Sequence, residues 1–210
     1  MNLIFDWIFA QYKDTPSYLV VLEMVGVFFG FLSVWYSKKE NILVFPTGII
    51  STGIFVYILL VFGLLGDMLI NAYYFAMSVF GWYFWTRKTE DDSLVSVTRT
   101  TRKEQQWSVV LFFGTILFIC IVYIIFDKFN TWTAYIDTVT TAIFFVGMWL
   151  MAKKKLENWV YWIIGDVISV PLYWYKGLIF TSLQFFLFTI IAIYGYLAWK
   201  KSINNTLRIL

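Results

Sequence analysis

Long apolar segments separated by short polar connections run along almost the whole chain. Seven of them reach 17 residues or more, which is enough for a helix that crosses a bilayer. They are expected at residues 18–36, 42–62, 66–85, 107–126, 133–151, 159–175 and 178–199. The segments are continuously apolar rather than alternating, which favours helices over the strands of a membrane barrel. The pattern predicts an all-α integral membrane protein with seven transmembrane helices in a single membrane domain, residues 1–210.

Composition supports this class and narrows the chemistry. The chain is 60% hydrophobic, 22% aromatic and 14% charged, well outside the range of soluble domains. Its longest polar stretch, from about Arg87 to Gln106, leaves no room for a sizeable soluble domain. Histidine is absent and Cys120 is the single cysteine, so neither a disulfide nor the usual metal ligands are available. We therefore expect no metal and no cofactor.

The basic residues predict the orientation in the membrane. With seven spans the two termini lie on opposite sides, so the 16 Lys and Arg residues can be sorted by side. The side of the N-terminus receives three of them, Lys13, Lys128 and Lys176, and the other side receives the remaining 13. Because basic residues gather on the cytoplasmic side, we expect the N-terminus outside and the C-terminus inside.

An internal repeat emerges when the chain is compared with itself at an offset of 114 residues. The matching pairs are Trp35 and Trp149, Gly63 and Gly177, Gly81 and Gly195, Trp85 and Trp199, and Glu23 and Asp137. These matches predict two three-helix repeats, 18–85 and 133–199, joined by a linking helix, 107–126. The linking helix makes both repeats run in the same direction, a parallel 3+1+3 architecture. A substrate site is then expected near the interface of the repeats.

The fifth and sixth apolar segments each carry a carboxylate, Asp137 and Asp166, and a charge costs roughly 2.5 kcal/mol or more at a helix centre. Asp137 shares a helix face with Thr141, four residues later. Asp166 shares a face with Trp162 and Tyr173. These spacings predict polar groups that face the interior of the bundle.

Further polar side chains on the third and seventh spans, among them Asn71 and Gln184, complete a candidate pocket in the outer half of the membrane. Such residues also hydrogen-bond neighbouring helices in many bundles, and that alternative stays open. No Lys or Arg falls inside a span, so the pocket is expected to repel phosphate and to take a neutral or cationic ligand. The candidate substrate-binding residues are Asn71, Tyr74, Asp137, Thr141, Trp162, Asp166, Tyr173 and Gln184.

Two runs, YIDTVTTAIFF and WLMAKKKLENWVYWIIGDVISVPLYWYKGL, and the endings GWYFW and GYLAW resemble the Pnu family of vitamin transporters. The resemblance spans residues 18–201 and is closest to the nicotinamide riboside branch. It implies a fold related to the SWEET sugar transporters, a homotrimer and a place in the bacterial inner membrane. It also implies facilitated diffusion of nicotinamide riboside without a coupling ion. Phosphorylation by a cytoplasmic kinase then traps the vitamin for NAD biosynthesis.

The resemblance suggests roles for the candidate residues. Asp137 and Asp166 would balance the pyridinium charge or accept hydrogen bonds from the ribose, and Trp162 and Tyr173 would pack the ring. The three remaining polar groups, Asn71, Thr141 and Gln184, would orient the polar atoms of the ligand. Thiamine, carried by a sister branch, is also cationic and aromatic, so it stays as the alternative substrate.

Other classes of seven-helix protein fit less well. A retinal protein needs a lysine in its last helix, and none lies between Gly177 and Trp199. An intramembrane aspartyl protease of the presenilin type needs the GxGD spacing, but position 163 is Ile. No enzymatic activity is therefore expected. A channel is not excluded by sequence, although a repeat with a polar interior favours a carrier.

Overall fold

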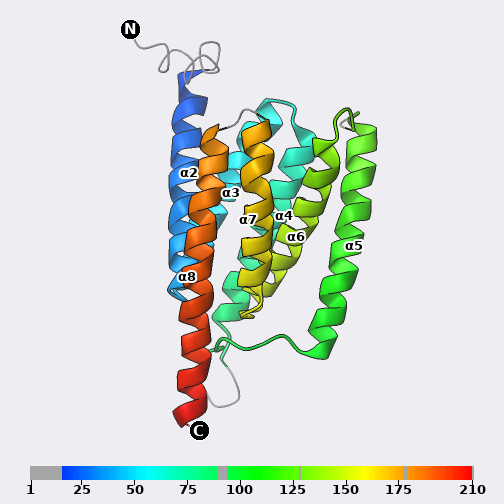
Figure 1. The fold of residues 1–210 in the computed structure, drawn as a ribbon. Coiled ribbons are helices and arrows are strands. Elements are labelled where there is room, and N and C mark those ends of the chain that lie inside the picture. Colours follow the sequence, from blue (N-terminus) through cyan, green and yellow to red (C-terminus); the bar gives the residue numbers. More distant parts are fainter. Residues whose placement is uncertain (1–15, 89–93, 128, 177–178, 210) are drawn as a thin grey trace.

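The structure, a computed structural model, describes residues 16–88, 94–127, 129–176 and 179–209. These residues form seven α-helices, labelled as in Figure 1. They are α2 (Ser17–Lys38), α3 (Val44–Val61), α4 (Leu65–Trp85), α5 (Arg102–Ile125), α6 (Thr133–Ala152), α7 (Asn158–Tyr175) and α8 (Ile179–Ile209). Each helix covers one of the predicted apolar segments.

Two helix ends differ from the prediction by five residues or more. Helix α5 begins at Arg102 rather than at 107 because Thr101 caps it: the Glu104 N–H donates to Thr101 Oγ1 at 3.3 Å, and Glu104 Oε2 accepts from the Thr101 N–H at 2.9 Å. Helix α8 runs on to Ile209 rather than ending at 199. No Gly or Pro follows Trp199, so nothing in the sequence ends the helix there.

Five of the seven described helices are long and apolar enough to cross a membrane, judged by length and composition. Helices α4 and α7 are the two that fall short. Helix α4 carries Asp67 and Asn71, and α7 carries Asn158 and Asp166. The prediction of seven apolar spans therefore holds for five helices, and the remaining two are more polar.

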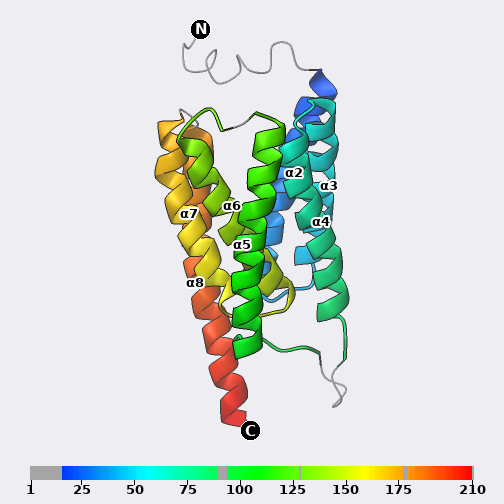
Figure 2. The same ribbon diagram turned by 90° about the vertical axis from the view of Figure 1, so that its right-hand side faces the viewer.

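Six helices form a closed ring. Along the ring, α2 packs against α3, α3 against α4, α4 against α6, α6 against α7, α7 against α8, and α8 back against α2 (Figures 1 and 2). Helix α5 lies outside this ring, at its edge, and packs mainly against α6. Consecutive helices therefore form two groups of three, α2 to α4 and α6 to α8, which meet along α4 with α6 and α2 with α8.

Helices α2, α4, α6 and α8 end on the same side of the bundle (Figure 1), which we call the basic end because Lys38, Lys39 and Lys153 lie there. There the two groups exchange two equivalent hydrogen bonds, whose donors are 114 residues apart in the sequence and whose acceptors are also 114 apart. The Trp85 indole N–H donates to the Met151 carbonyl at 3.3 Å, and the Trp199 indole N–H donates to the Ser37 carbonyl at 3.0 Å. The indole rings lie 5.8 Å apart, and both tryptophans are buried. This cluster closes the ring at its basic end.

The turns that follow α2 and α6 have the same shape. Glu40 and Lys154 both have left-handed backbones, with φ of 54° and 57°. Their N–H groups donate to Ser37 O at 3.0 Å and to Met151 O at 2.9 Å. The two turns are again 114 residues apart, so equivalent positions adopt the same uncommon conformation.

The connection from α4 to α5 crosses the basic end and binds the α6–α7 turn. The Thr98 N–H donates to Lys154 O at 3.2 Å, and the Leu156 N–H donates to Thr98 O at 2.9 Å. Burial lowers the pKa of the Lys154 ammonium below its ordinary value, against the opposing effect of Glu40 at 3.9 Å. Glu104 of α5 pairs with Lys153 at 3.0 Å. These contacts fix α5 to the second group of helices.

Candidate functional site

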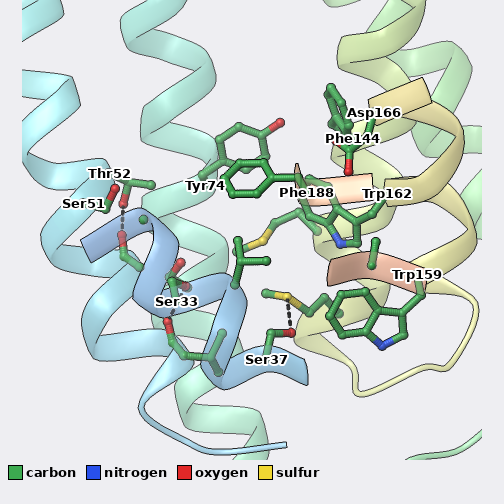
Figure 3. A pocket seen from close by; sticks show the side chains of 18 of the residues that line it. Ser33, Ser37, Ser51, Thr52, Tyr74, Phe144, Trp159, Trp162, Asp166 and Phe188 are labelled. Atoms are coloured by element: carbon green, nitrogen blue, oxygen red, sulfur yellow. Dashed lines mark hydrogen bonds between the residues drawn. The ribbon is translucent and has the colours of Figure 1, made fainter. Parts of the chain in front are cut away.

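A cavity of about 300 Å³ lies inside the ring and is lined by side chains from all six of its helices (Figure 3). It extends from the middle of the helices toward the basic end, where Trp159 and Ser37 line it. The sequence had placed the pocket in the other half. In the structure, Tyr173 stacks on Phe185 with ring centres 5.1 Å apart and does not line the cavity.

One wall of the cavity is aromatic and comes from α6, α7 and α8. The rings of Phe144 and Trp162 stack with centres 5.4 Å apart and planes 29° from parallel. Phe185 lies parallel to Phe144, within 10°, at 5.9 Å. The Phe144 ring also packs against the backbone of α7 at Gly165. Only glycine fits there, since a Cβ at position 165 would overlap the ring. The wall offers flat apolar faces on which a planar ring can stack.

Asp166 lies midway along α7 beside this wall, and it is only 3% exposed (Figure 3). Among the described residues, no Lys or Arg pairs with its carboxyl group and no hydrogen bond reaches it. A buried carboxylate without a partner is costly in free energy.

The opposite wall comes from α2, α3 and α4 and carries hydroxyl groups. Figure 3 shows Ser33, Ser37, Ser51 and Thr52 on this side, facing Trp162 across the cavity. Two of these hydroxyls donate to backbone carbonyls of α3: Ser33 Oγ of α2 donates to Val44 O at 2.8 Å, and Thr52 Oγ1 donates to Gly48 O of its own helix at 2.7 Å. The cavity is therefore apolar and acidic on one side and hydroxyl-lined on the other.

Three of the eight predicted site residues line this cavity, namely Tyr74, Trp162 and Asp166. A fourth, Tyr173, lies behind the aromatic wall against Phe185. The remaining four do not line it. Among them, Asn71 donates to the backbone of its own helix, at Asp67 O, at 3.0 Å. Thr141 and Gln184 are half-buried elsewhere in the bundle.

Asp137 lies in a different environment. Lys176, at the C-terminal end of α7, places its Nζ 2.6 and 2.7 Å from the two carboxylate oxygens of Asp137. The pair lines a separate cavity of about 250 Å³ together with Asp67 and Tyr123. The expected meeting of Asp137 and Asp166 in one pocket is not found, because the first carboxylate has a lysine partner at the other end of the bundle.

Sequence reasoning missed the hydroxyl wall. Serine and threonine are common in membrane helices, so Ser51 and Thr52 do not stand out from the apolar residues around them. The internal repeat carried the signal, because Thr52 precedes Asp166 by 114 residues and Gly48 precedes Trp162 by the same interval. Subtracting 114 from the positions of the candidate residues Trp162 and Asp166 gives Gly48 and Thr52, which lie on this wall.

Comparison with known proteins decides the family. A model of the family described as "Nicotinamide mononucleotide transporter" matches residues 20–201. The chain belongs to the nicotinamide mononucleotide transporter family. This membership confirms the resemblance found in the sequence, and it agrees with the predictions of a transporter and of a multi-pass protein in the bacterial inner membrane.

Named members of the family have related sequences. The nicotinamide riboside transporter PnuC of Escherichia coli (strain K12) is 26% identical over 208 residues, which cover 86% of this chain and 85% of the relative. The riboflavin/roseoflavin transporter RibM of Streptomyces davaonensis is 21% identical over 185 residues, covering 87% and 86%. The crystal structure of the vitamin B3 transporter PnuC matches with a TM-score of 0.65 at 20% identity, over 96% of this chain and 88% of that one. The last match establishes the fold.

Proposed function

We propose that this transporter takes up a cationic aromatic vitamin, and that the vitamin is nicotinamide riboside. The observation that carries the proposal is Asp166, a buried carboxylate that has no partner among the described residues and lies beside the faces of Trp162 and Phe144. A pyridinium ring combines a flat apolar body with a delocalised positive charge. It satisfies the carboxylate and the aromatic wall at the same time.

The other candidate residues take lesser roles. Tyr74, on α4, also lines the cavity and is a further contact for the ligand. Tyr173 supports the aromatic wall from behind through Phe185. We assign no contact with the substrate to Asn71, Thr141, Asp137 or Gln184, because none of them lines the cavity.

The proposed transport cycle rests on the two groups of helices. We propose that 18–85 and 133–199 are parallel repeats joined by 107–126, as in the SWEET transporters, and that they rock about the cavity. The matched turns support this 3+1+3 division, and so do the two indole hydrogen bonds, whose donors and whose acceptors are each 114 residues apart. The positive-inside rule supports an N-terminus outside and a C-terminus inside, which makes the basic end cytoplasmic.

We propose facilitated diffusion without a coupling ion. Asp166 is the one charged residue among the described residues that line the cavity. A coupling cation and a cationic vitamin would therefore compete for a single carboxylate instead of binding together. Net uptake then depends on removal of the free vitamin inside the cell by a cytoplasmic kinase. A homotrimer is part of the proposal on the strength of the family resemblance.

Thiamine is the second candidate substrate. Its thiazolium ring is also flat and cationic, so the pairing of Asp166 with Trp162 suits it on the same grounds. Riboflavin, which gives a relative its name, has a large neutral ring system and gains nothing from a carboxylate.

The experiment is a binding titration of the purified protein by tryptophan fluorescence, with nicotinamide riboside, thiamine and riboflavin in parallel. Trp162 and Trp159 line the cavity and serve as internal probes. We expect saturable binding that is tightest for the riboside. Counterflow in proteoliposomes without an ion gradient then tests facilitated diffusion. Tightest binding of thiamine would transfer the function to the second candidate, and tightest binding of riboflavin would contradict the role of Asp166.

A further inference from the structure

The two walls of the cavity are related by the internal offset of 114 residues, yet their chemistry differs. Thr52 on the first wall corresponds to Asp166 on the second. Ser78 corresponds in the same way to Ala192, and both of these residues line the cavity. Equivalent positions therefore carry hydroxyls on one side and acidic or apolar side chains on the other.

Size differs between the walls as well. Gly30 and Gly48 on the first wall correspond to Phe144 and Trp162 on the second. The large rings occupy one half of the cavity, and the glycines leave room in the other. A Cβ at Gly48 would lie only 3.1 Å from Ser33 Oγ and 3.2 Å from Ser78 Oγ. The glycine thus lets hydroxyl groups of two further helices, α2 and α4, approach the backbone of α3.

Two hydroxyls of this wall are without a hydrogen-bond partner in the described part of the chain. Ser51 on α3 and Ser78 on α4 are 6% and 3% exposed, and both line the cavity. By contrast, Ser33 and Thr52 donate to backbone carbonyls of α3. Neither Oγ atom is among the fully enclosed polar atoms of the described residues that lack a partner, so both open onto the cavity. The two hydroxyls are therefore available to a polar group of a ligand in the cavity.

We propose that Ser51 and Ser78 form the subsite for the hydroxyl-bearing part of the ligand. The inference rests on the proposed function and deepens it. When the cationic ring stacks on the aromatic wall beside Asp166, the substituent on the ring nitrogen extends toward Ser51 and Ser78. A hydroxyl both donates and accepts, so two serines match the neighbouring hydroxyls of a sugar. This subsite selects a ribosylated ring over the bare ring.

The test compares nicotinamide riboside with N-methylnicotinamide, which has the same cationic ring and no sugar. Wild type, Ser51→Ala, Ser78→Ala and the double variant are titrated with both compounds. We expect each single change to weaken riboside binding about fivefold, the scale of one net hydrogen bond. Binding of N-methylnicotinamide should stay within about twofold of wild type, because the ring contacts are intact.

Ser108→Ala is the matched control. Ser108 is 3% exposed, as is Ser78, but it lies on α5 outside the ring and donates to Glu104 O at 2.9 Å. It should leave both affinities unchanged. Unaltered riboside affinity in the double variant, or an equal loss for both compounds, would overturn the subsite while the ring site stands. Failure of the wild type to bind either compound would overturn the proposed function itself.

Discussion

Asp137 and Asp166, two aspartates of the membrane helices, have opposite environments in this structure. Asp137, near the start of α6, holds the Lys176 ammonium at 2.6 Å, and both side chains keep about a fifth of their surface exposed. Asp166, in the middle of α7, is 3% exposed and has no such partner in the described residues. The comparison teaches that a carboxylate in a membrane span does not by itself mark a site. We propose that a carboxylate left without a counter-charge does.

The difference has a geometric origin. Lys176 follows the last residue of α7, and its Nζ also lies over the Tyr173 ring at 4.9 Å. A long lysine stem reaches from a helix end to a neighbouring carboxylate near the surface. Asp166 lies ten residues earlier on the same helix, roughly 15 Å along its axis at 1.5 Å per residue. No described basic side chain reaches that depth.

The largest expected effect comes from Asp166→Asn. The change keeps the shape of the side chain and removes the charge that, in the proposed function, balances the ligand. We expect riboside affinity to fall by about 2 kcal/mol, or roughly 30-fold in Kd. Thermal stability should be equal to wild type or higher, because an unpaired buried charge has been removed. Titration and a melting curve on the same sample separate the two effects.

A phosphate on the ligand should have the next largest effect. Nicotinamide mononucleotide carries the same ring with an added anionic group, and the cavity offers a carboxylate and no described basic side chain to receive it. We expect it to bind about tenfold more weakly than the riboside, or about 1.4 kcal/mol. The difference in affinity between the riboside and the mononucleotide should be smaller in Asp166→Asn. Equal binding of the two compounds by wild type would show that the charge of the cavity does not select the ligand.

A smaller effect, on stability alone, is expected from Lys176→Met. The substitution leaves Asp137 unpaired, as Asp166 is in the wild type. Because the pair is partly exposed, with side chains 23% and 20% accessible, we expect a loss of about 1 kcal/mol in the free energy of unfolding. Riboside affinity should stay within about twofold.

The double variant Asp137→Asn with Lys176→Met supplies the control for this pair. It removes both charges together, so most of the lost stability should return. Denaturant unfolding in detergent measures the difference. A large fall in riboside affinity in either variant would place the ion pair in the binding site and contradict the separation of the two aspartates.

Much of the fold could be predicted from the sequence, because continuous apolar segments determine membrane helices directly. Helical spacing also predicted that Trp162 and Asp166 lie together, since an interval of four residues puts them on one face of α7. The start of α5 was missed because a capping box outweighs the polarity of the first turn after Thr101.

The rest of the site depended on tertiary contacts. Nothing in the sequence pairs Asp137 with Lys176, which lies 39 residues away and outside the predicted span. The free hydroxyls of Ser51 and Ser78 are equally invisible, since any serine in a helix has its own backbone as a possible partner. Which hydroxyls lack a partner is decided by the packing of α2, α3 and α4 around the cavity.

The most direct measurement compares nicotinamide riboside with its reduced dihydro form, which keeps the sugar but carries no charge on the ring. Both are titrated against wild type, Asp166→Asn and Asp137→Asn. We predict that wild type and Asp137→Asn prefer the cation, and that Asp166→Asn loses that preference. A preference for the cation that survives Asp166→Asn, or one that disappears in Asp137→Asn, would contradict the role of Asp166 as the counter-charge of the substrate.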